Sequence, residues 1–279
     1  MGGFPIGGGA AKLGIPGVII ALIIAVLGGG SILGGDGSSS SSLPDIFNQM
    51  PGAQAGTSNF DASTDPNADL ADFSVKVFLD VLESWEKQFA AAGGTYQRAK
   101  LSPFSGSVST ACGSATSAVG PFYCPGDQHV YVDLDFQKEL TTKFGAAGDF
   151  AWAYVIAHEV GHHVQYLTGV NETVRSQSKK SPSKANDLSV RQELQADCMA
   201  GVWGYSAFGR DILENGDLEE GLLAAERVGD VWIQKNLGSG KVNPDGFTHG
   251  TSAQRQKWFK VGFDSGDPSK CDTFSVSKP

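Results

Sequence analysis

Apolar side chains recur at helical spacing in the segment that begins near residue 70. The positions are Leu70, Phe73, Val77, Phe78, Val81, Leu82, Trp85 and Phe89. Because residues three and four apart share one face of an α-helix, this spacing predicts an amphipathic helix that ends at Gly93 and Gly94. The opposite face carries Asp80, Glu83 and Glu86, so we expect this helix to pack against a core rather than lie on a membrane.

The pattern changes between residues 101 and 136, where Gly and Pro interrupt it repeatedly. Residues 129–134 alternate and predict a strand whose Val130, Val132 and Leu134 face the core. A short helix is expected over residues 137–144. This part of the chain therefore predicts a small sheet inside a mainly helical protein.

Residues 150–157 are apolar almost all round, which is typical of a helix buried in a core. Asp149 is a candidate N-cap for this helix, and Gly169 is a candidate residue just beyond its end. The polar segment 170–184 predicts an exposed loop. Ser189 followed by Gln192 fits a capping box, so a second helix is expected to begin at Ser189.

Two further packed helices are expected near the C-terminus, over residues 218–237 and 252–263. Together with the earlier elements they predict an α+β fold that is mainly helical with a small sheet. The domain is expected to span residues 70–279, a length sufficient for one sizeable core.

Residues 15–33 carry no ionisable side chain. At about 1.5 Å per residue, such a helix is just long enough to cross a bilayer core of roughly 30 Å. We expect one N-terminal transmembrane anchor here, with a cleaved signal peptide as the alternative. Lys12 before the segment, against Asp36 and Asp45 after it, orients the N-terminus inward and the domain outward.

The anchor is preceded by a short Gly-rich tail, residues 1–14, and followed by a Gly/Ser-rich segment, residues 34–69. The second segment predicts a flexible linker, because its composition cannot bury enough apolar area to offset the entropy of ordering. The chain carries a net charge of −9 and no basic stripe, which argues against nucleic acid as a partner.

His158 and His162 stand four residues apart, so on a helix their rings project from one face. Two imidazoles at this spacing, with Glu159 after the first, are typical of a zinc site in which the glutamate takes a proton from zinc-bound water. The alternative is an ordinary helix with a hydrogen-bonded histidine pair. His163 points about 100° away, so we interpret it as a packing residue.

A third ligand is expected from the helix that follows Ser189. Glu193 and Asp197 lie on one face, and the small residues Ala196, Ala200 and Gly201 nearby would allow a close approach to the histidine helix. We assign Glu193 as the ligand and Asp197 as the acceptor of the outer N–H of a ligating histidine. Asp197 as ligand with Glu193 behind it, or a solvated acidic face paired with Arg191, remain alternatives.

His249 lies in a Gly-flanked loop before the last helix. It is a candidate catalytic residue that donates a hydrogen bond to a developing oxyanion. Capping of the helix that starts at Ser252 is the alternative role.

The four cysteines show no Cys-x-x-Cys spacing, and an even number outside the cytosol predicts two disulfides. Of the three possible connectivities we choose Cys112 with Cys124 and Cys198 with Cys271. Four reduced thiols are the alternative and would imply an inverted topology.

Several stretches together resemble the neutral zinc metallopeptidases of bacteria, which are membrane-anchored zincin-like proteins. The matching stretches are residues 120–125, 130–133, 158–165, 193–198 and 249–252, with Gln254 and Arg255. The resemblance covers residue 70 to the C-terminus and implies a zincin-like fold with a zinc site. The Glu193/Asp197 spacing is also similar to that of the membrane proteases that include the CAAX prenyl endopeptidases, where the glutamate is the third zinc ligand.

Our leading hypothesis is a zinc-dependent endopeptidase on the outer face of a cell membrane, acting on a peptide or protein substrate that adds to the edge of the 130–134 strand. A non-catalytic envelope protein that uses the same scaffold to bind a partner is the competing hypothesis. A zinc hydrolase of cell-wall amides is a third.

Overall fold

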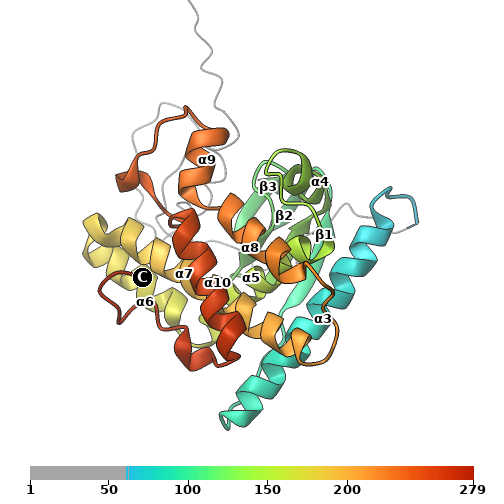
Figure 1. The fold of residues 1–279 in the computed structure, drawn as a ribbon, viewed down its shortest axis with the longest axis horizontal. Coiled ribbons are helices and arrows are strands. Elements are labelled where there is room, and N and C mark those ends of the chain that lie inside the picture. Colours follow the sequence, from blue (N-terminus) through green and yellow to red (C-terminus); the bar gives the residue numbers. More distant parts are fainter. Residues whose placement is uncertain (1–60, 62) are drawn as a thin grey trace, which may run out of the picture.

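The computed structural model describes residue 61 and residues 63–279 (Figure 1). The expected tail 1–14, the anchor 15–33 and most of the linker 34–69 lie outside these residues. Within the described part of the chain, no helix combines the length and the apolar content that a bilayer crossing requires.

The described chain is mainly helical with a small sheet, which confirms the α+β class. Eight α-helices occur: α3 (Ala68–Ala91), α4 (Leu134–Thr142), α5 (Asp149–Leu167), α6 (Val170–Lys180), α7 (Ala185–Phe208), α8 (Asp217–Arg227), α9 (Asp230–Asn236) and α10 (Ser252–Ser265). Five strands lie between α3 and α4: β1 (Lys100–Phe104), β2 (Ser107–Thr110), β3 (Gly113–Thr116), β4 (Phe122–Cys124) and β5 (His129–Asp133).

The strands form a three-stranded sheet of order β1-β5-β4 and a separate antiparallel pair, β2-β3. β5 is parallel to β1 and antiparallel to β4. The strand predicted over residues 129–134 is therefore confirmed, but the expectation that a substrate adds to its edge is wrong. Both edges of β5 are already paired, and the outer strand on the side of the cleft is β4.

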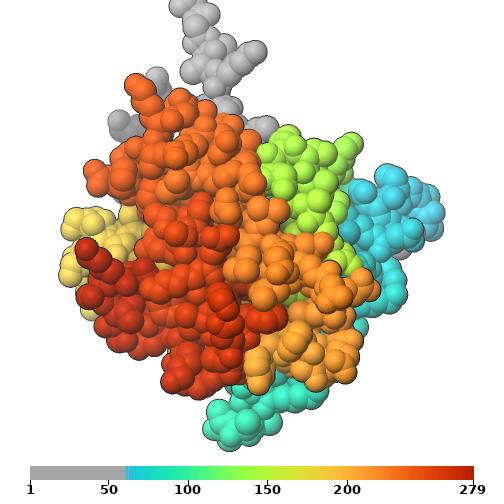
Figure 2. All heavy atoms as spheres, viewed as in Figure 1, coloured from blue at the N-terminus to red at the C-terminus, as the bar shows by residue number. Residues whose placement is uncertain are grey.

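α5 is the central helix of the molecule. Most of its residues are buried, because α3, α7 and α8 pack around it. In Figure 2 the orange and red C-terminal segments cover much of the visible face, and in Figure 1 α8 and α10 lie in front of α5, with α9 above them. An apolar surface on all sides of residues 150–157 is what such a position requires.

α7 and α10 approach each other through two glycines. A Cβ on Gly201 would lie 2.0 Å from the carbonyl oxygen of Phe259, and one on Gly262 would lie 1.9 Å from that of Cys198. Only residues without a side chain allow this contact. Gly201 therefore serves the packing of α10, whereas we had expected it to serve the approach to the histidine helix.

The polar segment after α5 is a helix and not the exposed loop that we predicted. Gly169 has a φ of 79°, a left-handed conformation that ends α5 and lets the chain turn into α6. α6 buries only Val174 and Ser178. Its apolar stripe is too narrow to stand out in the sequence.

Two other predicted boundaries are wrong for tertiary reasons. α7 begins at Ala185, because the Ser189 hydroxyl does not cap it but donates to the carbonyl oxygen of Thr248, 2.9 Å away. The single helix predicted over residues 218–237 is two helices, α8 and α9, separated at Gly229. A Cβ on Gly229 would lie 2.6 Å from the backbone nitrogen of Ser252, the first residue of α10. The chain therefore bends at Gly229, where it passes close to the start of α10.

Both predicted disulfides are confirmed. Cys112–Cys124 joins the end of the β2-β3 hairpin to β4, and Cys198–Cys271 joins α7 to the C-terminal segment. The second bond lies next to Asp197, so it holds the C-terminal segment against the helix that carries the predicted third ligand.

Candidate metal centre

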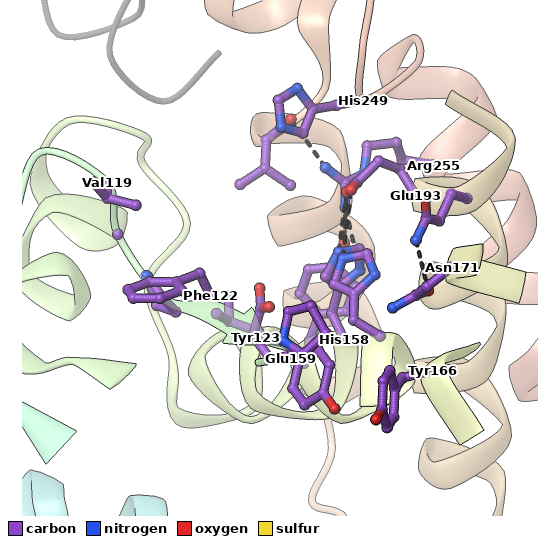
Figure 3. A pocket seen from close by; sticks show the side chains of 18 of the residues that line it. Val119, Phe122, Tyr123, His158, Glu159, Tyr166, Asn171, Glu193, His249 and Arg255 are labelled. Carbon is purple, nitrogen blue, oxygen red and sulfur yellow. Dashed lines mark hydrogen bonds and ion pairs between the residues drawn. The ribbon is translucent and has the colours of Figure 1, made fainter. Parts of the chain in front are cut away.

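α5 and α7 bring the predicted ligands together. Nε2 of His158 lies 3.2 Å from one carboxylate oxygen of Glu193, and Nε2 of His162 lies 3.4 Å from the other. One ligand atom from each of the three residues falls within 4.8 Å of the others. Figure 3 shows His158 of this group in the cleft, with Glu159 beside it.

The two helices meet through small residues, as the sequence predicts. A Cβ on Gly161 would lie 3.1 Å from the carbonyl oxygen of Ala196. Gly161 lies between the two histidines on α5, and Ala196 lies between Glu193 and Asp197 on α7. The close contact therefore occurs at the level of the candidate ligands and brings a short glutamate side chain within reach of both rings.

Asp197 lies behind His158. Nδ1 of His158 is 2.9 Å from the carboxylate of Asp197, which as an ionised acid can only accept, so Nδ1 donates and Nε2 is the nitrogen that faces Glu193. Glu193, and not Asp197, is thus the acid that faces both Nε2 atoms.

Gln165 orients the other histidine. Its side-chain oxygen lies 2.9 Å from Nδ1 of His162, and its amide nitrogen donates to the carbonyl oxygen of Gln192 at 2.7 Å. Gln165 is itself fully buried. Both rings are therefore fixed with Nδ1 bound to protein and Nε2 available for a metal ion.

Arg255 on α10 is a part of this site that sequence reasoning did not assign. Its guanidinium donates two hydrogen bonds of 2.8 Å to the two oxygens of Asp197 and lies 4.0 Å from Glu193. The Tyr154 hydroxyl donates a third, 2.6 Å bond to Asp197. A signal was present, because Arg255 lies at helical spacing with the buried Trp258 and Phe259.

The electrostatics of this cluster favour a cation. Although burial raises the pKa of Glu193, the neighbouring histidines hold it well below its usual range. Burial lowers the pKa of His158, but hydrogen bonds to Asp197 and Glu193 outweigh this and raise it to about 9. The carboxylates therefore create a negative potential at the two imidazoles, where either a proton or a metal ion is stabilised.

Glu159 points into the cleft beside the three candidate ligands (Figure 3). Burial raises the pKa of its carboxyl, an effect that the two neighbouring histidines partly offset. It does not belong to the group of three converging ligand atoms. A carboxylate in this place suits a proton acceptor better than a ligand.

His249 also lines the cleft, and Asp230 on α9 holds its loop. The buried carboxylate of Asp230 accepts hydrogen bonds from the backbone N–H groups of Thr248, His249 and Gly250, at 2.9, 2.7 and 2.9 Å. It also lies 3.3 Å from Nδ1 of His249. The sequence offered no local signal for Asp230, which lies 19 residues away from His249. The helix that follows is capped by Thr251, so His249 is not needed as its cap.

His163 has the packing role that its direction predicts. Its ring is fully buried on the other side of α5, within 2.9 Å of the Tyr123 hydroxyl and 2.6 Å of the carbonyl oxygen of Gln97. It therefore ties α5 to β4 and to the segment before β1.

Two imidazole nitrogens and one ionised carboxylate are a donor set that fits Zn²⁺ and leaves a coordination position for water or substrate. The ring orientations also fit a zinc site, since Nδ1 of His158 is hydrogen-bonded to Asp197 and Nδ1 of His162 to Gln165. The geometry thus defines the class of site, a candidate two-histidine, one-glutamate metal centre at the base of a cleft.

The chain belongs to the family described as "Putative neutral zinc metallopeptidase", whose model matches residues 1–274. It is 45% identical over 280 residues to the Uncharacterized protein YpfJ of Escherichia coli, covering 99% of this chain and 93% of that protein. It is 48% identical over 193 residues to the Uncharacterized protein Rv2575 of Mycobacterium tuberculosis, covering 65% and 64%. No solved structure matches this chain.

Proposed function

We propose that this protein is a zinc-dependent peptidase whose metal ion is held by His158, His162 and Glu193. The observation that carries the proposal is the convergence of the two Nε2 atoms on the Glu193 carboxylate, with Glu159 in the same cleft. Membership of a family named for zinc peptidases supports it. When bound, the metal would supply a Lewis acid that polarises the scissile carbonyl and acidifies water.

Side chains of the protein have the remaining roles in the proposed reaction. Glu159 accepts the proton of the attacking water and returns it to the nitrogen of the leaving amine. His249, held by Asp230, donates a hydrogen bond to the oxygen that becomes negatively charged. Asp197 and Gln165 keep the two ligating rings in one orientation.

The cleft has a strand edge in its wall to which a peptide could pair. β4 is the outer strand of its sheet, and Phe122 and Tyr123 of β4 line the cleft beside Glu159. An extended chain that pairs with a free strand edge gains main-chain hydrogen bonds. We therefore propose that the substrate binds along β4, in place of the β5 edge expected from the sequence.

We further propose that the domain works outside the cytoplasm, anchored by residues 15–33. The two disulfides support this location, because such bonds persist in oxidising compartments. The test is fractionation of cells that express the tagged protein, followed by protease treatment of spheroplasts. Recovery in the soluble cytoplasmic fraction, with reduced cysteines, would contradict this location.

The decisive test of the proposed activity is Glu159→Gln. The amide keeps the size of the side chain but cannot accept the proton, so cleavage of a peptide library should fall at least about 100-fold. Zinc content, measured by mass spectrometry, should be unchanged. The matched control is Glu83→Gln on the exposed face of α3, which should cleave like the native protein.

Retained cleavage in the Glu159→Gln protein would rule out this mechanism. Native protein that binds zinc but cleaves no peptide would instead favour the non-catalytic scaffold. Release of amino groups from purified cell wall, without cleavage of any peptide, would favour the amide hydrolase.

A further inference from the structure

The cleft around the candidate metal centre is lined by two chemically different sets of residues. It encloses about 440 Å³, within the range of pockets that bind small molecules or side chains. Apolar side chains line much of it, Val119, Phe122, Phe136, Phe144, Val155 and Ile233, and we call this part of the lining the apolar end. The polar residues Asn171, Glu172, Arg175 and Gln192 line it as well. Figure 3 shows Val119 and Phe122 on one side of Glu159 and Asn171 on the other.

The apolar end is preformed. Phe136, Phe144 and Ile233 are at most 7% exposed, and the Phe136 and Phe144 ring centroids lie 5.6 Å apart. Gly120, with a φ of 74°, brings the backbone so close to Phe136 that a Cβ would lie 3.2 Å from the ring. A wall packed in this way cannot supply a hydrogen bond or a counter-ion to a polar group that enters it.

The apolar end begins beside the proposed general base. Val155 precedes Glu159 by four residues on α5, so the two side chains lie on the same face of the helix, one turn apart. Glu159 must reach the nitrogen of the leaving amine to protonate it. The substrate residue that contributes this nitrogen is therefore the one placed next to the apolar end.

We propose that the apolar end binds the side chain of the residue immediately after the scissile bond, so that the protein cleaves before large apolar residues such as Leu and Phe. This inference rests on the proposed function and adds the substrate class. Full burial of such a side chain stabilises the complex by an amount equivalent to at least about tenfold in affinity. An acidic side chain in the same place would lose its hydration without a partner.

The test uses the full-length protein, purified in detergent and loaded with zinc. Its substrates are peptides that differ at one position, with Leu, Phe, Ala, Ser or Asp on the carboxyl side of a bond cleaved in the library. We expect kcat/KM to be at least about tenfold higher for Leu or Phe than for Ser or Asp. Binding of the same peptides to the Glu159→Gln protein, which needs no turnover, should follow the same order.

A variant that fills part of the apolar end should shift the substrate preference from large to small residues after the scissile bond. Ile233→Phe adds a ring to the wall and is expected to lower kcat/KM for the Phe peptide about tenfold while sparing the Ala peptide. The matched control is Ile212→Phe, which makes the same change at a residue 51% exposed and outside the cleft. If Ile233→Phe does not fold, Val119→Phe at the rim of the apolar end makes the same test.

Three results would overturn the inference. Cleavage that is indifferent to the residue after the bond, or that instead selects an apolar residue before it, overturns the substrate class and leaves the peptidase intact. An unchanged preference in folded variants of the apolar end does the same. Absence of cleavage of any peptide by native protein, matching the Glu159→Gln protein, overturns the proposed function and this inference together.

Discussion

Two buried polar regions of this molecule differ in how their charges are satisfied. In the metal centre, Asp197 accepts hydrogen bonds from His158, Tyr154 and Arg255, and Arg255 also faces Glu193. At the sheet, Asp133 of β5 is equally buried, but one of its carboxylate oxygens has no hydrogen-bond partner.

The two aspartates have opposite pKa shifts for this reason. Burial alone raises the pKa of a carboxyl group. Arg255 and His158 overcome this effect at Asp197 and hold its pKa below the ordinary value. At Asp133 the hydrogen bonds from Ser117 and Asp135 are too weak to do so, and burial raises the pKa to about 6. The ionised form of Asp197, which belongs to the candidate site, is thus stabilised by its neighbours, whereas the ionised form of Asp133 is not.

Removal of Arg255 should have the largest effect. Arg255→Met leaves two buried carboxylates without their cation, so the free energy of unfolding should fall by about 3–5 kcal/mol in chemical denaturation. Arg98→Met is the control, because Arg98 pairs with Glu86 at the surface and should cost at most about 1 kcal/mol. Equal stability of the two variants would show that Arg255 does not balance this cluster.

Asp197→Asn should weaken metal binding. The amide can present its NH₂ group to His158 and no longer polarises the ring, so zinc affinity should fall about 10- to 100-fold in competition with a chelator. Asp187→Asn changes an exposed acid on the same helix and should leave zinc affinity unaltered. Native affinity in the Asp197→Asn protein would contradict the positioning role of Asp197.

The pKa of Asp133 is raised, whereas that of Asp197 is lowered, so Asp133 should make the protein less stable as pH rises. Since its folded pKa, about 6, lies above the ordinary 3.8, folding favours the protonated acid. Its contribution to the free energy of unfolding is therefore greatest below about pH 4 and falls as pH rises through about 6, by about 3 kcal/mol. Asp133→Asn should remove this slope in denaturation measured from pH 4 to 7, whereas the exposed Asp135→Asn should keep it.

Asp230→Asn should give the smallest change. Replacing the carboxylate that binds three consecutive backbone N–H groups loosens the His249 loop, and we expect kcat to fall about tenfold with zinc content unchanged. Asp245→Asn, an exposed change in the segment just before this loop, is the control. A native kcat in the Asp230→Asn protein, with His249→Ala impaired, would show that the loop holds its position without Asp230.

Local patterns in the sequence determined the elements that depend on a few neighbouring residues. The spacing of His158 and His162 on an apolar helix is such a pattern, because one turn of helix is enough to align two rings. The alternation around β5 and the end of α5 at Gly169 were predictable for the same reason. Cysteine number and context also sufficed for two disulfides.

The tertiary structure decided what depends on distant partners. Arg255 and Asp230 serve the site only because α10 and α9 fold back against α7 and the His249 loop. The sequence shows that residues 170–180 are polar, yet packing against α5 and α7 makes them a helix. The position of β5 between two other strands follows from pairing with β1, from which the β2-β3 hairpin and β4 separate it along the chain. Spacing fixes geometry within one element, whereas the contacts between elements depend on how the whole chain buries its apolar surface.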